Sequence, residues 1–388
     1  MVIEQIYTGC LAQGAYYVES EGEVAIIDPL REIDPYLEKV KKEKSKIKYI
    51  FETHFHADFL SGHLDLANKS GADIVYGPEA HTDYDIIMAT DHQVFRVGKV
   101  TLQALHTPGH TLESTCYLLR NEKGKAHALF TGDTLFIGDV GRPDLAIKTS
   151  FTKEDLAGML YESLRNKIMP LPDDIIIYPA HGAGSACGKN MSNETQDLLG
   201  NQKMTNYALR ADMTKVEFIK EVTEGILPPP QYFAKNAQLN KTGIKSIDGV
   251  LKQGMVALDI DLLESLVEHE KALVLDTREP EEFAQGHIPN AIFIGITGSF
   301  APWVGALIND LNQPIVFIAS EGMEKEVVTR LSRVGYDHTL GYLEGGFTTW
   351  VNAGKDVETI TSISAETFSK QYSKKSLNVI DVRKPGEF

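Results

Sequence analysis

The feature that most restricts the fold of this chain is a short run of possible metal ligands, the sequence Thr-His-Phe-His-Ala-Asp-Phe at residues 53–59. It directly follows an apolar run at 48–51 that is typical of a buried strand. His54, His56 and Asp58 are spaced two apart, so a loop at the end of that strand can turn all three side chains toward one point. Imidazole and carboxylate groups that converge in this way bind divalent metal ions.

Three further segments carry the same kind of residue after the same kind of strand. His110, Asp133 and His181 each follow an apolar run and lie next to proline or glycine. We therefore expect these side chains on one rim of a sheet, around a divalent metal. The alternative is a set of unrelated surface histidines, which four such segments in one order disfavour. Histidines without this context are interpreted as structural or surface residues: His63, His81, His92, His106 and His127.

The ordered set resembles the signature of the metallo-β-lactamase superfamily over about residues 1–230. The resemblance implies an αβ/βα sandwich with the metal at the edge between two sheets. Most members of the superfamily have a histidine directly after the motif aspartate, where it ligates a second metal. Phe59 occupies that position here. Because an apolar ring cannot ligate a metal, we expect one metal ion rather than a pair.

The separation between His54 and His110 resembles that of the persulfide dioxygenase branch of the superfamily. By this resemblance His54, His110 and Asp133 would hold one non-haem Fe(II), with open positions where substrate sulfur and O₂ bind side by side. The remaining motif residues would support the ligands or bound water through hydrogen bonds: His56, Asp58 and His181. The implied reaction oxidises a low-molecular-weight thiol persulfide with O₂ and water to thiol and sulfite. A Zn-dependent thioester hydrolase of the glyoxalase II type is the alternative.

Three residues are candidates for the substrate pocket. Arg142 could grip a carboxylate or another anion on the thiol carrier, or it could form a surface salt bridge. Tyr178 could reach the pocket from the end of its strand, or it could pack in the core. Cys187 lies in a Gly-rich loop that we expect to be exposed, where its thiol could hold sulfane sulfur. A small buried filler is the alternative for this cysteine.

The amino-acid composition limits the classes of partner and the cellular location that we expect. Lys and Arg total 38 against 54 Asp and Glu, a formal charge of −16, which disfavours a nucleic-acid groove or an anionic membrane surface. We expect no membrane span, because no stretch reaches about 18 apolar residues, and the sequence begins without the pattern of a secretory signal. Three cysteines fit a reducing compartment, so the cytoplasm is the expected location. The acidic surface permits a homo-oligomer, which we also expect.

A second domain is expected at 257–356, after a polar, irregular linker at 231–256. Its alternating strands and helices predict an α/β domain with a parallel sheet. The sequences at 275–291 and 345–354 resemble the two signatures of the rhodanese family. A working rhodanese carries a nucleophilic cysteine after its central strand, but Ala319 stands there. We therefore expect this module to be inactive in sulfur transfer and to serve docking or scaffolding.

A repeat predicts the beginning of a second, truncated copy of this module at 363–388. The sequence Asp-Thr-Arg-Glu-Pro at 276–280 recurs as Asp-Val-Arg-Lys-Pro at 381–385, again after an apolar run. Because 363–388 is too short to bury a core, we expect either a chain that continues beyond Phe388 or an unstructured tail. In a longer chain, an active rhodanese could combine sulfite with another persulfide to give thiosulfate. The expected fold class is α/β throughout: a metallo-β-lactamase sandwich, a rhodanese-like domain and the start of another.

Overall fold

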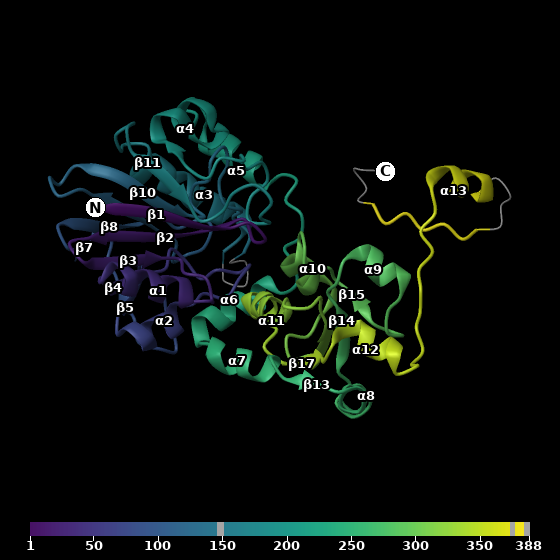
Figure 1. Ribbon diagram of the computed structural model, residues 1–388. Coiled ribbons are helices and arrows are strands. Elements are labelled where there is room, and N and C mark those ends of the chain that lie inside the picture. The colour runs from purple at the N-terminus through teal and green to yellow at the C-terminus, as the bar shows by residue number, and fades with distance from the viewer. Residues whose placement is uncertain (146–150, 373–376, 384–388) are drawn as a thin grey trace.

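The computed structural model describes residues 1–145, 151–372 and 377–383, and it divides most of them between two domains that lie side by side (Figure 1). The N-terminal domain contains two β-sheets, and the C-terminal domain contains a third. Helices α6 (Phe233–Thr242) and α7 (Ile247–Gly254) connect them. Within these described ranges, no helix is long and apolar enough to cross a membrane.

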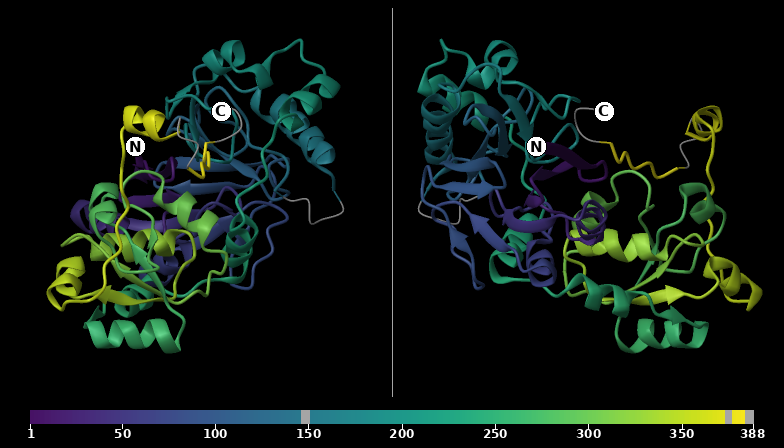
Figure 2. Two further views of the ribbon diagram at one scale, coloured as in Figure 1. Left: turned by 90° about the vertical axis from the view of Figure 1, so that its right-hand side faces the viewer. Right: turned by 60° about the vertical axis from the view of Figure 1, so that its left-hand side comes forward.

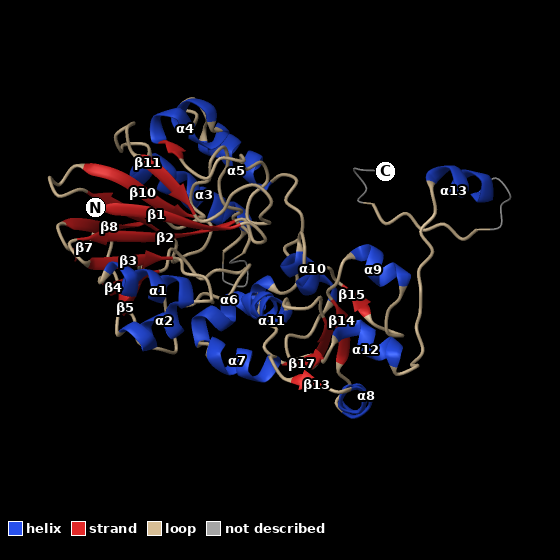
Figure 3. Ribbon diagram, in the orientation of Figure 1, coloured by secondary structure: helices blue, strands red, loops and turns tan. Residues whose placement is uncertain are grey.

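The N-terminal domain is a sandwich of two six-stranded sheets with helices on the outside, which confirms the predicted architecture (Figure 3). The first sheet has the order β1-β2-β3-β4-β5-β6, and the second has the order β12-β11-β10-β9-β8-β7. The strands of the first sheet are β1 (Val2–Thr8), β2 (Gln13–Ser20), β3 (Glu23–Ile27), β4 (Lys46–Phe51), β5 (Asp73–Tyr76) and β6 (Ile87–Met88). Those of the second are β7 (Val94–Val97), β8 (Val100–His106), β9 (Thr115–Arg120), β10 (Ala126–Gly132), β11 (Ile176–Pro179) and β12 (Asp197–Leu198).

Each sheet is covered on its outer face by helices that bury an apolar stripe. Over the first sheet lie α1 (Asp34–Glu43) and α2 (His63–Ser70). Over the second lie α3 (Lys153–Ser163), α4 (Leu199–Thr205) and α5 (Lys215–Thr223), together with a π-helical turn (Leu164–Ile168) and a 3₁₀ turn (Tyr207–Leu209). Thr152 and Thr214 begin α3 and α5 as capping boxes, in which the threonine side chain accepts a backbone hydrogen bond three residues on.

The two sheets approach each other closely at the edge where β4 and β10 end. Gly132, the last residue of β10, has a φ of +52°, and a Cβ there would lie 2.5 Å from the Thr53 hydroxyl oxygen. Only glycine fits this backbone and this contact. The backbone N–H of Thr115 also donates to the Thr53 carbonyl at 2.9 Å. The loops that follow β4 and β10 therefore meet at one edge of the sandwich.

The segment 231–256 is helical rather than irregular, which corrects the predicted linker. Asn236 and Asn240, which gave it a polar appearance, are buried. The amide nitrogen of Asn240 donates to the carbonyls of His56 and Phe59 at 2.7 and 2.8 Å. The prediction was wrong because these two asparagines interrupt the apolar periodicity of α6 although both are buried, and Asn240 binds the backbone of the loop at 53–60.

The C-terminal domain confirms the predicted parallel sheet, with the order β13-β17-β16-β14-β15 and parallel pairing throughout. Its strands are β13 (Ala257–Leu258), β14 (Leu273–Asp276), β15 (Ile292–Phe293), β16 (Ile315–Ile318) and β17 (Thr339–Leu343). Its helices are α8 (Ile260–His269), α9 (Pro280–Gln285), α10 (Phe300–Leu307), α11 (Glu324–Arg333) and α12 (Gly346–Asn352). Ala319 directly follows the central strand β16.

The C-terminal segment repeats one local structure of that domain without its core. Asp276 Oδ1 accepts from the backbone N–H and Nε of Arg278 at 3.1 and 3.0 Å, and Asp381 Oδ1 accepts from those of Arg383, both at 3.0 Å. Asp276 is buried, however, whereas Asp381 is exposed, and helix α13 (Ala365–Tyr372) buries no residue. The rest of the repeat, 384–388, lies outside the described residues.

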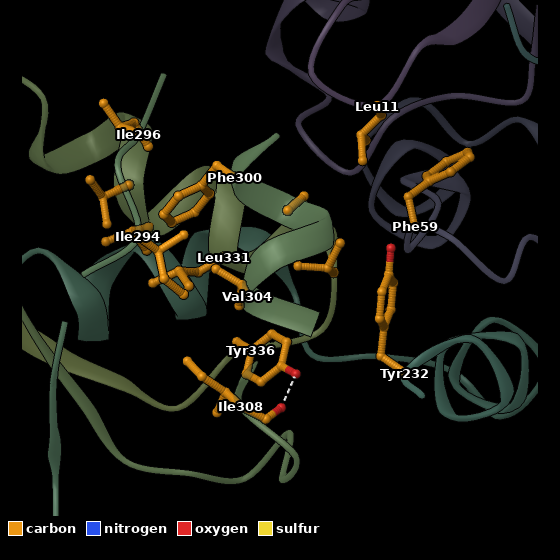
Figure 4. Close-up of a cluster of buried hydrophobic side chains, with 14 of the residues drawn as sticks. Leu11, Phe59, Tyr232, Ile294, Ile296, Phe300, Val304, Ile308, Leu331 and Tyr336 are labelled. Atoms are coloured by element: carbon orange, nitrogen blue, oxygen red, sulfur yellow. Dashed lines mark hydrogen bonds between the residues drawn. The ribbon is translucent and has the colours of Figure 1, made fainter. Parts of the chain in front are cut away.

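Both views in Figure 2 show the two domains against each other. They share one apolar cluster, to which both the N-terminal domain and α10 contribute (Figure 4). A buried ion pair lies nearby. Arg31, which is fully buried, donates from both terminal nitrogens to the Asp337 carboxylate at 2.6 and 2.7 Å and to the carbonyls of Ser332 and Lys245. Because apolar contacts and a buried charge both cross this boundary, we expect the domains to keep a fixed relative orientation.

Candidate metal centre

Three side chains of metal-ligand type converge at the edge of the sandwich: His54 after β4, His110 after β8 and Asp133 after β10. His54 Nε2 and His110 Nε2 lie 3.8 and 3.4 Å from Asp133 Oδ2. The two imidazole rings are perpendicular, with centroids 4.9 Å apart, and all three side chains are buried. Two imidazole nitrogens and one carboxylate oxygen around one point are typical of a metal site with several open positions.

Hydrogen bonds behind these side chains determine which atom faces the centre. His110 Nδ1 donates to the Arg142 backbone carbonyl at 2.8 Å, which leaves the Nε2 lone pair free. His54 Nδ1 lies 3.0 Å from the Thr53 hydroxyl. His181 Nδ1 lies 2.8 Å from Asp133 Oδ1, which leaves Oδ2 toward the centre. Partners of this kind orient metal ligands and tune their basicity.

The centre also contains polar atoms that need a partner. His110 Nε2 and Asp133 Oδ2 are buried, and neither has a hydrogen-bond partner among the described residues. Buried polar atoms are seldom left unsatisfied, because each costs the free energy of its lost hydration. A cation between these atoms would satisfy both, so the residues present fit a divalent metal.

The charges at the centre also suit metal binding. Burial and the nearby charge of His56 hold the pKa of His54 well below its usual value, so its imidazole is neutral, as a ligand must be. Burial acts to raise the pKa of Asp133, but the charge of His181 and its hydrogen bond to this carboxylate outweigh it and hold that pKa far below the usual range. Burial likewise acts to lower the pKa of His181, but Asp133 and Asp58 raise it to about 10. The carboxylate of Asp133 is therefore ionised.

Behind Asp133, three buried residues form a second group of possible ligands: Asp58, His181 and Cys187. His181 Nε2 lies 2.8 Å from Asp58 Oδ2, so Asp58 and His181 connect to the centre through Asp133. Phe59 is fully buried, and its ring centroid lies 4.4 Å from that of His56. An apolar ring therefore occupies the position next to Asp58.

His56 faces away from the three-ligand centre. Its Nε2 lies 3.1 Å from Asp28 Oδ1 and 3.4 Å from Glu52 Oε2. Burial acts to lower the pKa of His56, but these two carboxylates raise it well above its usual value. Asp28 Oδ2 accepts a hydrogen bond from the Thr53 hydroxyl, which contacts His54. His56 thus connects to the candidate ligand His54 through Asp28 and Thr53, and its ring also lies against that of His54, with centroids 4.2 Å apart.

Three residues of this supporting network were not found from the sequence: Asp28, Glu52 and His63. Glu52 Oε1 lies 3.2 Å from His63 Nδ1, and all three side chains are buried. Asp28 directly follows β3, as the ligands follow their strands, so its position gave a usable signal. Glu52 lies between the strand and the motif, where the pattern gives no such signal.

Arg142 and Tyr178 both make structural contacts, and their roles at the substrate stay predictions; Arg142 also lines a cavity next to Asp58. The Arg142 guanidinium donates to the Asp144 carboxylate at 2.6 and 2.8 Å and to two backbone carbonyls, so it forms a buried ion pair rather than a surface one. These partners compete with any substrate anion. Tyr178 stacks on Phe130 with ring centroids 5.4 Å apart, inside the core between the sheets.

Cys187 is buried, with 1% of its surface exposed, although Gly184 and Ala186 of the same loop are exposed as expected. It packs in the apolar cluster shared by the domains, together with Phe136 and Tyr232. Burial, followed by the charges of Asp58 and Asp133, raises the pKa of its thiol well above the usual value. The Gly-rich sequence was misleading for this side chain because the connecting segment and the C-terminal domain contribute to the cluster in which Cys187 is buried.

We expect Cys187 and Cys116 to resist alkylation in the folded protein, whereas Cys10 reacts. Cys187 and Cys116 are buried, and burial raises the pKa of Cys116 to about 11, so few thiolates form at about pH 8. Cys10 is only partly buried. Iodoacetamide treatment followed by peptide mass spectrometry measures each site, and labelling in urea provides the reference. Native labelling of Cys187 at the rate of Cys10 would contradict its burial.

Comparison with protein-family models matches residues 8–181 to the metallo-beta-lactamase superfamily and residues 259–353 to the rhodanese-like domain. Among curated proteins, the probable hydroxyacylglutathione hydrolase glo2 of Schizosaccharomyces pombe is 35% identical over 160 residues, which are 40% of this chain and 58% of the relative. The chain thus spans less than two thirds of that relative's length.

Two solved structures extend the comparison. A metallo-beta-lactamase from Staphylococcus aureus subsp. aureus COL is 30% identical with a TM-score of 0.77, and the match covers 88% of this chain and 98% of that one. ETHE1 from Myxococcus xanthus is 27% identical with a TM-score of 0.53, covering 62% of this chain and 98% of that one. The first likeness therefore includes both domains.

Proposed function

This chain belongs to the metallo-β-lactamase superfamily through its N-terminal domain and carries a rhodanese-like domain, and from that premise we propose that it is a persulfide dioxygenase. One Fe(II), held by His54, His110 and Asp133, is the cofactor. The substrate is a low-molecular-weight thiol persulfide. With one O₂ and one water it gives one thiol and one sulfite: the S–S bond breaks, the outer sulfur is oxidised and O₂ is reduced.

The observation that carries the proposal is the buried Phe59 beside a complete His/His/Asp set. The phenyl ring removes the ligand with which most members of the superfamily hold a second metal next to Asp58. A single metal with two imidazoles and one carboxylate keeps open positions, and this set suits Fe(II) oxygen chemistry. The likeness to ETHE1 and the fused rhodanese-like domain support the same substrate class.

The chain's own residues orient the ligands and keep water away. When bound, the iron would supply redox chemistry and adjacent positions for sulfur and O₂. The Arg142 carbonyl fixes the His110 ring, and His181 fixes the Asp133 carboxylate. Phe59 and Phe136, both fully buried, give the surroundings of Asp58 and His181 an apolar wall that excludes bulk water.

A zinc-dependent thioester hydrolase is the second candidate, because the relative from Schizosaccharomyces pombe is named a hydroxyacylglutathione hydrolase. The group of Asp58, His181 and Cys187 could offer ligands to a second metal in that case. Zinc-bound hydroxide would then be the nucleophile.

Anaerobic purification followed by metal analysis separates the two candidates. The same preparation is assayed for O₂ uptake and sulfite formation with glutathione persulfide and coenzyme A persulfide, and for hydrolysis of hydroxyacylglutathione. We expect iron near one equivalent, O₂ uptake, and one sulfite per O₂. Zinc with thioester hydrolysis and no O₂ uptake would overturn the dioxygenase proposal in favour of the hydrolase.

A further inference from the structure

A cavity of about 1130 Å³ lies where the two domains meet. That volume is slightly above the roughly 300–1,000 Å³ that small-molecule sites occupy. The N-terminal domain contributes Asp58 and Gly188, the connecting segment contributes Tyr232, and the C-terminal domain contributes Ser299 and Arg330. Since Asp58 also contacts His181, the cavity borders the network that holds the metal ligand Asp133.

Tyr232 lines the cavity together with Asp58. It precedes α6, is 4% exposed, and belongs to the cluster that contains Phe59 and Cys187. Figure 4 shows its hydroxyl pointing toward Phe59 and Leu11 of the N-terminal domain. Burial, followed by the charges of Asp58 and Cys187, raises the pKa of Tyr232 well above its usual value. The hydroxyl therefore keeps its proton and can act as a donor.

The C-terminal domain holds the Tyr232 ring in place through Gly305 on α10. A Cβ on Gly305 would lie 2.1 Å from Cδ1 and 2.3 Å from Cε1 of Tyr232. Only a residue without a side chain lets the helix approach the ring this closely. The position of the hydroxyl therefore depends on a helix of the rhodanese-like domain.

Contacts of α11, another helix of the same domain, hold that domain against the loop at 53–60. The backbone N–H of Leu60, next to Phe59, donates to the carbonyl of Arg333 in α11 at 2.7 Å. The Arg333 guanidinium also pairs with Glu32 of the N-terminal domain. Because of these contacts, we expect the residues that the C-terminal domain contributes to the cavity to keep fixed positions relative to the N-terminal domain.

We propose that this cavity binds the thiol carrier of the substrate, and that the Tyr232 hydroxyl donates a hydrogen bond to its sulfur-bearing end. The rhodanese-like domain, which lacks the nucleophilic cysteine, then serves as one wall of the dioxygenase pocket and positions Tyr232 through Gly305. The ligand class is a low-molecular-weight thiol persulfide and the thiol product derived from it. This inference rests on the proposed function for the identity of the substrate.

Three single variants and one double variant test the inference on the iron-loaded full chain. Tyr232→Phe removes only the hydroxyl, Gly305→Ala displaces the ring, and Gly249→Ala is the matched control because a Cβ there meets nothing within 4 Å. KM and kcat are measured with glutathione persulfide and coenzyme A persulfide. Binding of glutathione and coenzyme A is measured by calorimetry without O₂, and iron content and the melting temperature are recorded for each variant.

We expect Tyr232→Phe to raise KM and the thiol Kd about five- to ten-fold, the loss of one hydrogen bond, with unchanged iron content. Gly305→Ala should do the same, and Gly249→Ala should change neither. The double variant Tyr232→Phe/Gly305→Ala should match the worse single variant within about twofold, since both act on one hydroxyl. A purely structural role would instead lower the melting temperature and leave KM and Kd unchanged.

Unchanged KM and Kd in Tyr232→Phe would overturn the inference, whatever Gly305→Ala does. The proposed function can fail separately. If the wild-type protein binds the thiols but consumes no O₂, the proposed dioxygenase function is overturned and the inference about the pocket still holds. If the wild-type protein consumes O₂ with the persulfides and Tyr232→Phe keeps the wild-type KM and Kd, only the inference about the pocket is overturned.

Discussion

Replacement of His110 by alanine should remove most of the bound iron and abolish O₂ uptake with persulfide substrates. His110 offers one of three atoms that face the centre, and its Nε2 is buried without another partner among the described residues. A methyl group cannot replace that lone pair. Loss of a residue behind a ligand typically costs about 10–100-fold in metal affinity or activity, so the loss of a ligand itself should exceed about 100-fold. Metal analysis and O₂ uptake on the same preparation measure both effects.

His127→Ala is the matched control for that substitution. His127 lies on β10, which also ends at the centre, but it belongs to none of the buried ligand groups found among the described residues. His181→Gln provides a graded case, because it disturbs the partner of Asp133 and leaves the three ligands in place. We expect about a 10–100-fold loss for His181→Gln. Wild-type iron content and O₂ uptake in His110→Ala would exclude the three-residue centre.

The metal-facing residues could be predicted from the sequence because each follows a strand. The edge where β4, β8 and β10 end is fixed by strand pairing, so His54, His110 and Asp133 are brought together by the sandwich itself. The same logic explains His181, which follows β11. Proline or glycine after an apolar run indicates the end of a strand and the start of a loop, and this pattern can be recognised in the sequence alone.

The supporting network could not be predicted in the same way. His56 was expected to face the metal ligands, but β3 lies beside β4 and brings Asp28 against its ring. Glu52 reaches both His56 and His63, which is a contact that no spacing reveals. Alternation along one strand gives the direction of a side chain, whereas its partner depends on which strand lies alongside.

The boundary between the domains was harder to predict, because a polar residue there can be either solvated in a linker or buried with a hydrogen-bond partner. Asn240 suggests a solvated linker in the sequence, yet it is buried, and its amide oxygen accepts from the backbone N–H of Ser61 at 2.9 Å. Cys187 was expected in an exposed loop, and a surface salt bridge was one of the two interpretations of Arg142. Both residues are buried: Cys187 packs in one cluster with Tyr232, and the Arg142 guanidinium donates to the Leu227 carbonyl. Burial by a distant segment of the chain depends on the tertiary structure, so it cannot be predicted from the residues that are local in the sequence.

Replacement of Arg31 by methionine should separate the unfolding of the two domains and cost about 3–5 kcal/mol, because it leaves the Asp337 carboxylate without its partner. Arg31 is fully buried, and its guanidinium joins the N-terminal domain to Asp337, to Ser332 and to the connecting segment at Lys245. Calorimetry of the wild-type protein should then show one cooperative transition. The variant should show two, with the C-terminal domain unfolding first.

Two further variants test whether the loss of stability comes from the unpaired buried carboxylate of Asp337 or from the loss of any ion pair. Arg31→Met/Asp337→Leu removes both charges, so it should recover much of the lost stability, since no unpaired carboxylate remains. Lys99→Met breaks an ion pair with Glu21 in which both side chains are more than half exposed, and it should leave the transition unchanged. If Arg31→Met unfolds in one transition at the wild-type temperature, the apolar cluster around Tyr232 and the contacts of Arg333 with Glu32 and Leu60 hold the domains together, and the ion pair contributes only to the specificity of their orientation.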